Sequence, residues 1–421
     1  MKTKTTDAKF YTYRFRLYPN AEQTTYFNEQ MSYNRFIYNF FLERATYLHK
    51  IYGVKYNYNS MQNIIPLLKK GFSFLKNANS QSLQASLRDL DTAFQKFFKK
   101  QAGYPNFKKK GVYSSIVIPQ GFHIDGSFIK IPKLKTPIKV KFHRKFYEMV
   151  KSISISKTAS GKYYVNMLVE KFAYSPYILK KAINVSTGID LGIKDFATVT
   201  TGTDINNKKS FKIPNNKYLV KSQKRLIKLS RQLDRKQHKR SKQDKTTASN
   251  NYVKFKNKLS LLHEKVTNQR NDFLHKLSLR VVSDSQVIAL EDLNIKGMVK
   301  NRHLSKSISD VSWYRFASML EYKADWFGRQ IFKVNRFYPS SKTCSKCGYI
   351  YKDLKLSERF WTCPVCHTTH DRDINASINL FLEAIKIGKG LAKFMPAEYA
   401  PAGYQNTGIS RHTSKQESCA L

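Results

Sequence analysis

Four cysteines in the C-terminal part of the chain form the clearest chemical pattern in the sequence. They occur as two Cys-x-x-Cys pairs, Cys344 with Cys347 and Cys363 with Cys366, and fifteen residues separate the pairs. This spacing is typical of a zinc ribbon, in which two short knuckles supply four thiolates to one tetrahedral ion. The sequence therefore predicts a structural Zn²⁺ site.

Three acidic residues in distant segments are candidates for a second metal site. Asp190 lies near the end of a predicted strand over 185–191, and Glu291 ends the apolar run 287–290. Asp373 opens a predicted helix soon after the second cysteine pair. Strand ends and helix starts hold side chains firmly, so the three carboxylates are placed to converge if the fold brings these segments together.

Such a group of acids suits phosphodiester hydrolysis by two divalent ions. The ions lie about 4 Å apart and are held by carboxylates, so that one activates water and the other stabilises the leaving oxygen. Mg²⁺ prefers oxygen ligands and keeps bound waters, so few acids suffice. Each acid alone has a simpler interpretation: Asp190 as a turn residue, Glu291 as an ordinary strand end, and Asp371 as the cap of the helix that Asp373 enters.

The remaining cysteine and the neighbouring histidines are further candidate ligands. Five cysteines, four of them in knuckle spacing, indicate a reducing cytoplasm rather than a disulfide framework. Cys419 lies in a polar tail and has no predicted role. His367 or His370 is an alternative zinc ligand, although four thiolates already complete a tetrahedral site.

The net charge of the chain indicates the class of its partner. The 421 residues include 75 Lys and Arg against 29 Asp and Glu, a formal charge of +46, together with 26 Tyr and 28 Phe. Cations bind phosphates and aromatic rings stack on unpaired bases, so the composition favours nucleic acid. We expect no membrane partner, because the sequence has no apolar run of 18 residues and no signal-peptide core.

The first 180 residues predict a β-rich body with a helical insertion. Residues 10–17 alternate as a half-buried strand, and Asn20 with Gln23 forms a capping-box pattern before a helix that reaches about residue 50. A second helix is predicted over 80–100, and strands follow within 114–171. The second helix carries an apolar stripe that predicts core packing: Leu83, Leu87, Leu90, Phe94 and Phe97.

The later part of the chain adds helices of two kinds. The segment 221–245 is strongly basic, which fits either a solvated helix face or a helix that follows phosphates. The helix predicted over 252–282 has a buried stripe instead. The residues after about 389 lack periodicity and predict a disordered tail. In the helix that Asp373 opens, the expected apolar face is Ile374, Ala376, Ile378 and Leu382.

Longer motifs resemble one known family. The segments GIDLGIKDFATV (188–199), ALEDLNIKGM (289–298) and PSSKTCSKCG (339–348), followed by CPVC and HDRDINASINL (370–380), are similar to TnpB, also called OrfB, of insertion sequences. Near the N-terminus, YRFRLYPNAEQ and YPNFKKKG resemble the corresponding region of that family. The resemblance spans about residues 10–385.

The resemblance implies an RNA-guided DNA endonuclease related to type V CRISPR nucleases, with an α/β plus β fold. A RuvC-like domain of the RNase H fold would comprise 185–340 and 370–388, with the four-cysteine zinc ribbon inserted over 341–369. By motif position, Asp190, Glu291 and Asp373 would be the catalytic carboxylates that hold two Mg²⁺ ions.

The resemblance also implies a role for the N-terminal part. Residues 1–184 would form a wedge-like, β-barrel-like domain with a recognition-like helical insertion at about 20–103. This domain would hold a guide RNA from the transposon end and read a short motif in double-stranded target DNA, while base pairing reads the target itself. The expected species is a cytoplasmic monomer with one RNA, and 389–421 is its predicted tail.

One residue departs from the family pattern, and two other functions stay open. His367 follows the second knuckle where the family usually has Gly, whereas Gly348 follows the first. One alternative function is an RNA-guided repressor whose nuclease has decayed, but all three acids are present. The other is an accessory protein of a conventional transposase, which suits so large a cationic surface less well.

Overall fold

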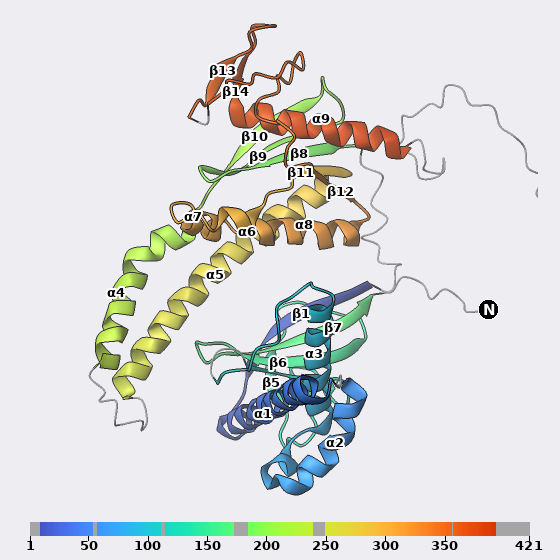
Figure 1. Cartoon of the computed structure of the whole chain (residues 1–421), viewed down its shortest axis with the longest axis vertical. Helices are drawn as coiled ribbons and strands as arrows, with labels where there is room; N and C mark the ends of the chain where they lie inside the picture. Colours follow the sequence, from blue (N-terminus) through green and yellow to red (C-terminus); the bar gives the residue numbers. More distant parts are fainter. Residues whose placement is uncertain are drawn as a thin grey trace, which may run out of the picture. The chain divides into compact units, whose positions relative to one another are not determined.

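The computed structural model describes residues 9–53, 57–110, 114–171, 184–238, 249–355 and 357–392. The chain divides into two compact units (Figure 1). Unit 1 comprises Met1–Ser175 with Leu226–Glu264, and unit 2 comprises Pro176–Arg225 with Lys265–Leu421. Within the described ranges, no helix is both long and apolar enough to cross a membrane. Cys419 and the residues after 392 lie outside the described residues.

The helices of unit 1 pack around an aromatic and aliphatic core. As predicted, Asn20 caps the first helix, and its side chain and that of Gln23 form a reciprocal capping box. Of the predicted stripe on the helix near residue 90, four members are buried and Phe97 is half-buried. The helix around Pro66 was not predicted. These elements are α1 (Ala21–Tyr52), α2 (Tyr58–Gly71), η1 (Ser73–Asn77) and α3 (Ser80–Phe98).

Unit 1 also contains a seven-stranded antiparallel sheet in the order β2-β6-β7-β1-β5-β4-β3. Its inner face forms a core with α1, around the fully buried Phe15, Leu17 and Phe27. The strands are β1 (Lys9–Tyr18), β2 (Ser114–Ile118), β3 (His123–Asp125), β4 (Phe128–Lys130), β5 (Ile138–Lys141), β6 (Val150–Lys157) and β7 (Tyr163–Lys171).

The chain path shows that this sheet is strongly curled. β2 and β3 stand at opposite edges, yet only the short link from Ile118 to His123 joins them. That link reaches at most about 17 Å, whereas the edges of a flat sheet of seven strands would lie about 29 Å apart. The curl fits the barrel-like prediction, although the pairing among the described residues does not close a barrel.

Unit 2 is built on a five-stranded mixed sheet in the order β10-β9-β8-β11-β12. The three strands that are consecutive in sequence pair antiparallel, and the last two run parallel to β8. The first and last strands of this order were not predicted. The strands are β8 (Ser186–Leu191), β9 (Asp195–Gly202), β10 (Lys208–Pro214), β11 (Val287–Glu291) and β12 (Gln330–Val334).

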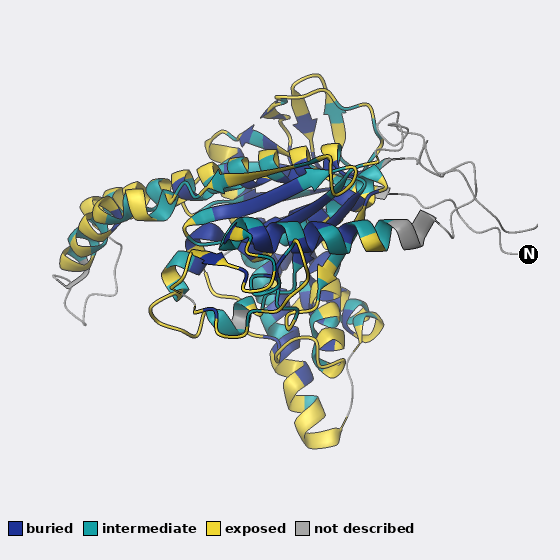
Figure 2. Ribbon diagram, turned by 90° about the horizontal axis from the view of Figure 1, so that it is seen from above, coloured by how far each residue is buried: buried dark blue, intermediate teal, exposed yellow. Residues whose placement is uncertain are grey.

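Helices cover both faces of this sheet (Figure 1). The C-terminal helix α9 (Arg372–Ala392) lies on one face, and α8 (Trp313–Phe327) with the later part of α5 (Asn250–Asp284) lies on the other. Residues 287–290 are therefore buried on both sides, as expected for a central parallel strand. Figure 2 shows the buried residues gathered in such strands, while the outward faces of the helices are exposed.

Two predictions about the last helix were wrong in detail. The helix continues to Ala392, a few residues beyond the predicted end at 388. Its buried face is also different, because Ile374, Ile378 and Leu382 are only half-buried. The helix packs so closely on the sheet that small and polar residues face inward instead. The buried residues are Asn375, Ala376, Ser377, Asn379, Leu380, Phe381 and Ala384.

Helix α4 (Tyr218–His238) covers the described part of the predicted basic segment 221–245. Its apolar Leu226 is buried, while the charged side chains point outward. Two short helices, α6 (Ile295–Met298) and α7 (Ser305–Val311), lead from the sheet to α8. The exposed basic residues of α4 are Lys221, Lys224, Arg225, Lys228, Arg231 and Arg235.

Candidate functional site

The four predicted zinc ligands come together in unit 2. Their Sγ atoms all lie within 4.8 Å of one another, and the Sγ–Sγ distances of Cys344 to Cys366 and of Cys347 to Cys363 are both 3.6 Å. Four sulfurs bound to Zn²⁺ at 2.3 Å in a tetrahedron would lie about 3.8 Å apart. The thiols therefore fit a tetrahedral zinc ion.

The two knuckles have matching backbones. The N–H of Gly348 donates to the carbonyl of Cys344, and the N–H of His367 donates to that of Cys363, each at 2.9 Å. Both donors lie in the left-handed region, with φ of 81° for Gly348 and 52° for His367. A side chain is strained in this conformation, so His367 holds the second knuckle at a cost that glycine would avoid.

The two histidines do not join the thiol group, because every member of that group is a cysteine. His370 lies instead against the outside of it. Its buried ring places Nε2 3.1 Å from Cys344 Sγ and packs on Trp361, with ring centroids 4.8 Å apart. This contact is the kind by which a neighbouring group orients a metal ligand.

Strand register brings the first two acids together. Leu290 of β11 pairs with Ile189 of β8 in parallel register, so the next residues, Glu291 and Asp190, end neighbouring strands side by side. Side chains alternate along a strand, so Asp190 lies on the same face as Gly188, two residues before it. That face is the one covered by α9, which brings the third acid.

Gly188 allows the helix to come this close. A methyl group at its position would overlap the backbone of Ser377 and Phe381 in α9. A hydrogen bond between the hydroxyls of Thr200 and Ser377, 2.7 Å long, fixes the same contact from β9. The start of α9, and with it Asp373, is therefore held at the ends of β8 and β11.

Asp371 caps this helix, as the simpler interpretation predicted. Its Oδ1 accepts hydrogen bonds from the backbone N–H groups of Asp373 and Ile374, both at 3.0 Å. The hydrogen bond from Lys212 and these N–H groups outweigh the effect of burial and lower the pKa of Asp371. Asp373 lies in the first turn, where the helix dipole favours a carboxylate.

The charges of the three acids act on one another. Burial raises the pKa of Asp190 well above its usual range, and the negative charges of Glu291 and Asp373 raise it further. The three carboxylates are therefore close enough to repel one another, and a divalent cation would relieve that repulsion. Among the described residues, the four cysteines are the one group of three or more potential ligands found close enough to hold a metal ion, so the carboxylates are more widely spaced than the thiols.

The segment before the first knuckle links the two centres, which sequence reasoning missed. The hydroxyl of Ser340 donates to Glu291 Oε1. Asn379 Nδ2 donates to the carbonyls of Ser340 and Thr343 at 2.7 Å, and Asn375 Nδ2 also reaches Thr343 at 2.7 Å. The four-residue spacing of the two asparagines on one helix face was the available signal.

Lys212 and Arg359 form ion pairs with the acids at the helix start, and neither contact was predicted. Lys212 Nζ of β10 is 2.8 Å from Asp371 Oδ2 and 3.9 Å from Asp373 Oδ2. Arg359 Nη1, from the segment between the two knuckles, is 3.4 Å from Asp373 Oδ1. A single basic residue in a chain this rich in lysine carries no signal in the sequence alone.

Three segments match known families. Residues 313–380 match a family described as "Cas12f1-like, TNB domain", residues 173–302 match "Probable transposase", and residues 11–51 match "Helix-turn-helix domain". A protein of Streptomyces pristinaespiralis named "Putative RNA-guided DNA endonuclease" is 33% identical over 90% of this chain and 91% of its own.

Two further proteins are similar over most of the chain. InsQ of Escherichia coli, also named a putative RNA-guided DNA endonuclease, is 31% identical over 87% of this chain and 90% of its own. The structure of a Cas12f1–sgRNA–target DNA complex matches with a TM-score of 0.55 at 17% identity, covering 86% of this chain and 83% of that one, which shows a shared fold. The chain belongs to the TnpB family, the family that its motifs resemble.

Proposed function

We propose that this protein is a transposon-associated, RNA-guided DNA endonuclease. The observation that carries the proposal is the meeting of Asp190, Glu291 and Asp373 near the C-terminal ends of β8 and β11, where their charges interact. The family relatives named RNA-guided DNA endonucleases support the same activity. Base pairing of the guide would choose the target, and the acids would serve the chemistry.

The unit 2 sheet supports the finer assignment to a RuvC-like domain. Three antiparallel strands followed by two strands parallel to the first is the strand order of the RNase H fold, with acids at the ends of the first and fourth strands. In this proposal the domain comprises 185–340 and 370–388, and the ribbon at 341–369 is inserted just before the last acid.

We infer that the carboxylates bind Mg²⁺ and the four cysteines bind Zn²⁺. When bound, two Mg²⁺ ions supply an activated water and charge neutralisation at the leaving oxygen. The residues of the chain contribute the ligand positions: Asp190 and Glu291 from strand ends, and Asp373 from a capped helix. The ribbon contributes no ligand to the reaction, but it anchors α9 and the Ser340 segment.

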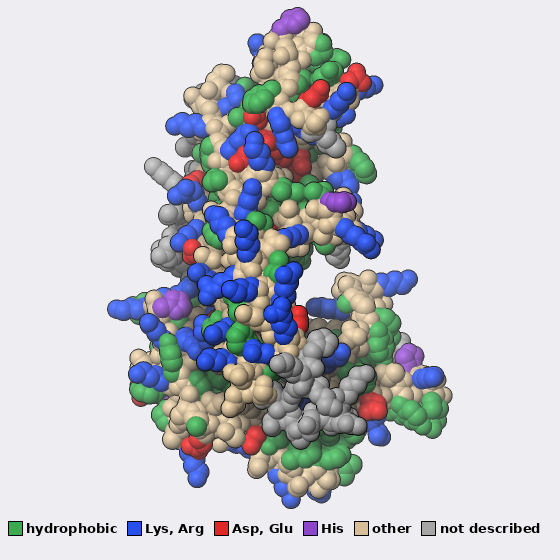
Figure 3. All heavy atoms as spheres, turned by 90° about the vertical axis from the view of Figure 1, so that its left-hand side faces the viewer, with side chains coloured by type: hydrophobic (Ala, Val, Ile, Leu, Met, Phe, Trp, Pro, Cys, Tyr) green, Lys and Arg blue, Asp and Glu red, His purple; other side chains and the backbone are tan. Residues whose placement is uncertain are grey.

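The cationic surface supports a nucleic-acid partner. Figure 3 shows Lys and Arg side chains over much of the face that it draws, with few Asp and Glu among them. Unit 1, with its curled sheet and helices, would hold the guide RNA and the motif-bearing DNA as the wedge-like domain of 1–184. The proposed species is a monomer with one RNA that acts on double-stranded DNA in the cytoplasm.

The test is to purify the protein with its co-expressed RNA, sequence that RNA, and add matching double-stranded DNA with Mg²⁺. The proposal expects a defined RNA from the transposon end and cutting that Asp190→Ala abolishes. As a matched control, Asp272→Ala removes an exposed acid of unit 2 that pairs with Lys276 in the next turn, and it should cut normally. Target binding without cutting by the unsubstituted complex would favour a repressor and refute the nuclease.

A further inference from the structure

Two cations of the chain, Lys212 and Arg359, pair with Asp373, while the charge of a third, Arg372, acts on Asp190. Lys212 lies on β10 on the same face as Ser210, whose hydroxyl bonds Thr200, which in turn bonds Ser377 of α9. This chain of hydroxyl groups fixes the face, so Lys212 points toward α9 and its acidic start. Its Nζ lies 2.8 Å from Asp371 Oδ2 and 3.9 Å from Asp373 Oδ2, so its charge is directed at the acidic start of the helix.

Arg359 reaches the same acids from the ribbon. The backbone N–H of Arg372, the first residue of α9, donates to the carbonyl of Arg359 at 2.8 Å. This bond holds Arg359 beside the helix start, where its guanidinium meets Asp373. Lys212 and Arg359 thus approach Asp373 from two sides, one on Oδ2 and the other on Oδ1.

We propose that Lys212 and Arg359 are exchangeable counter-cations of the acidic site, which a divalent metal must displace and which thereby set its metal affinity. The inference rests on the proposed function, because it takes Asp190, Glu291 and Asp373 as the metal ligands. Each cation lies against one oxygen of Asp373 that an arriving metal would need, although the nearer partner of Lys212 is Asp371. They are positioning residues, since they act on the carboxylates rather than on the substrate.

The size of the effect follows from the exposure of the pairs. The side chain of Lys212 is 32% exposed and that of Arg359 is 53% exposed. Ion pairs of this exposure contribute modestly, so releasing one should tighten metal binding by about two- to five-fold. Without either cation, the start of α9 and the carboxylate of Asp373 should stay ordered, because Asp371 keeps its two backbone N–H donors and continues to cap the helix.

The experiment measures Mn²⁺ binding to the full chain freed of nucleic acid, by the electron paramagnetic resonance signal of free Mn²⁺. Lys212→Met should lower the Mn²⁺ dissociation constant about two- to five-fold, and adding Arg359→Met should lower it further. Lys209→Met is the matched control, because it removes the same charge from the opposite face of the same strand. Zinc content and the midpoint of thermal unfolding show that each variant is folded.

The outcomes separate this inference from the proposed function. If Asp190→Ala removes Mn²⁺ binding but Lys212→Met binds no more tightly than Lys209→Met, the counter-cation role is overturned and the metal site stands. Weaker binding by Lys212→Met would also overturn it, because the lysine would then be supporting the ligands. If Asp190→Ala leaves Mn²⁺ binding unchanged, the proposed metal site itself fails.

Discussion

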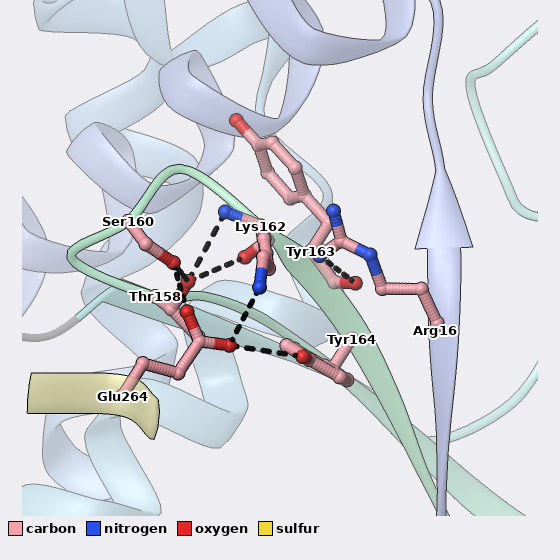
Figure 4. Close-up of polar contacts among 7 residues, drawn as sticks. All are labelled: Arg16, Thr158, Ser160, Lys162, Tyr163, Tyr164 and Glu264. Carbon is pink, nitrogen blue, oxygen red and sulfur yellow. Dashed lines mark hydrogen bonds and ion pairs between the residues drawn. The ribbon is translucent and has the colours of Figure 1, made fainter. Parts of the chain in front are cut away.

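Two carboxylate centres in this protein have opposite electrostatics. In unit 1, Glu264 of α5 accepts hydrogen bonds from the turn between β6 and β7 and from the start of β7 (Figure 4). The donors are Ser160, Lys162 at 3.2 Å and Tyr164 at 3.2 Å. These donors, against the effect of burial, lower the pKa of Glu264. In unit 2, burial and the charges of two other acids raise the pKa of Asp190.

The difference separates a structural acid from a candidate catalytic one. Glu264 is surrounded by donors that satisfy its charge, so its pairing stabilises the fold and leaves nothing for a ligand to do. Asp190 lies with like charges, an arrangement that costs folding free energy and that a bound cation would repay. Changes at the two centres should therefore have opposite effects on stability.

The largest effect is expected where the acidic site is assembled. Gly188→Ala puts a methyl group into the backbone of α9, which must move away from β8 and carry Asp373 with it. We expect the free energy of unfolding to fall by about 2–4 kcal/mol, and cutting of target DNA to be lost. Denaturant unfolding followed by circular dichroism measures the first effect.

Gly388→Ala is the matched control in the same interface. Its new Cβ would lie 3.4 Å from Val287 Cγ2, an ordinary contact. Alanine also favours the helix by up to about 1 kcal/mol over glycine. The variant should therefore be as stable as the unsubstituted protein or more so. Equal losses in both variants would show that the close approach at Gly188 does not hold the site together.

The second effect concerns the paired acid of unit 1. Glu264→Gln replaces charge-assisted hydrogen bonds by neutral ones and should cost about 1–2 kcal/mol of unfolding free energy at neutral pH. The folded pKa of Glu264 is lowered, so its contribution is present above the ordinary carboxyl value of about 4.3. It is lost as the pH falls below that value through the lowered pKa.

Unfolding titrations of both proteins at several pH values check this prediction. The difference in stability should shrink in acid and persist at neutral pH. Asp272→Asn, which breaks an exposed pair with Lys276, is the control and should leave the free energy of unfolding almost unchanged. A difference for Glu264→Gln that is independent of pH would mean that its charge is not what stabilises unit 1.

The third effect has the opposite sign. Asp190→Asn removes one of the mutually repelling charges in unit 2, so it should raise the free energy of unfolding by about 1 kcal/mol. The measurement is the denaturant midpoint without divalent metal and again with Mg²⁺. The gain should shrink when Mg²⁺ is added, because the metal stabilises the unsubstituted site and not the variant. A loss of stability without metal would contradict the electrostatic account.

The smallest effect is expected at the second zinc knuckle. His367 is held at a φ of 52°. The variant His367→Gly relieves that strain at some cost in chain entropy, so the free energy of zinc binding should improve by about 0.5–1 kcal/mol. Gly348→Ala, at the equivalent position of the first knuckle, should weaken zinc binding by a similar amount. Chelator titration of bound zinc by an absorbance indicator compares the two. Tighter zinc binding by both variants, or by neither, would refute the strain.

The sequence could predict the thiol site because its geometry is local. Two Cys-x-x-Cys pairs bring four sulfurs together through short turns, so spacing alone carries the information. The capping box at Asn20 and the strand containing Phe15 were predictable for the same reason. In each case the pattern that predicts the feature lies within a short stretch of sequence, even where its contacts do not.

The acidic site was only partly predictable, because distant contacts build it. Motif positions identified Asp190, Glu291 and Asp373, but their convergence depends on strand register and on the close approach of α9. Lys212 enters through β10, an edge strand whose lysine-rich sequence hides its strand character. The inward face of α9 was mispredicted for a related reason: an apolar stripe is expected from hydrophobicity, whereas this interface selects small and hydrogen-bonding side chains.

The most direct test of the account compares cutting by Asp190→Asn and Glu264→Gln in complexes with the same guide RNA. Both variants are isosteric and neutralise one carboxylate, and binding of matching DNA is measured beside cleavage in Mg²⁺. Both variants should bind the target, Glu264→Gln should cut at an undiminished rate, and Asp190→Asn should not cut. Cutting by Asp190→Asn at the rate of the unsubstituted protein would contradict the assignment of this site.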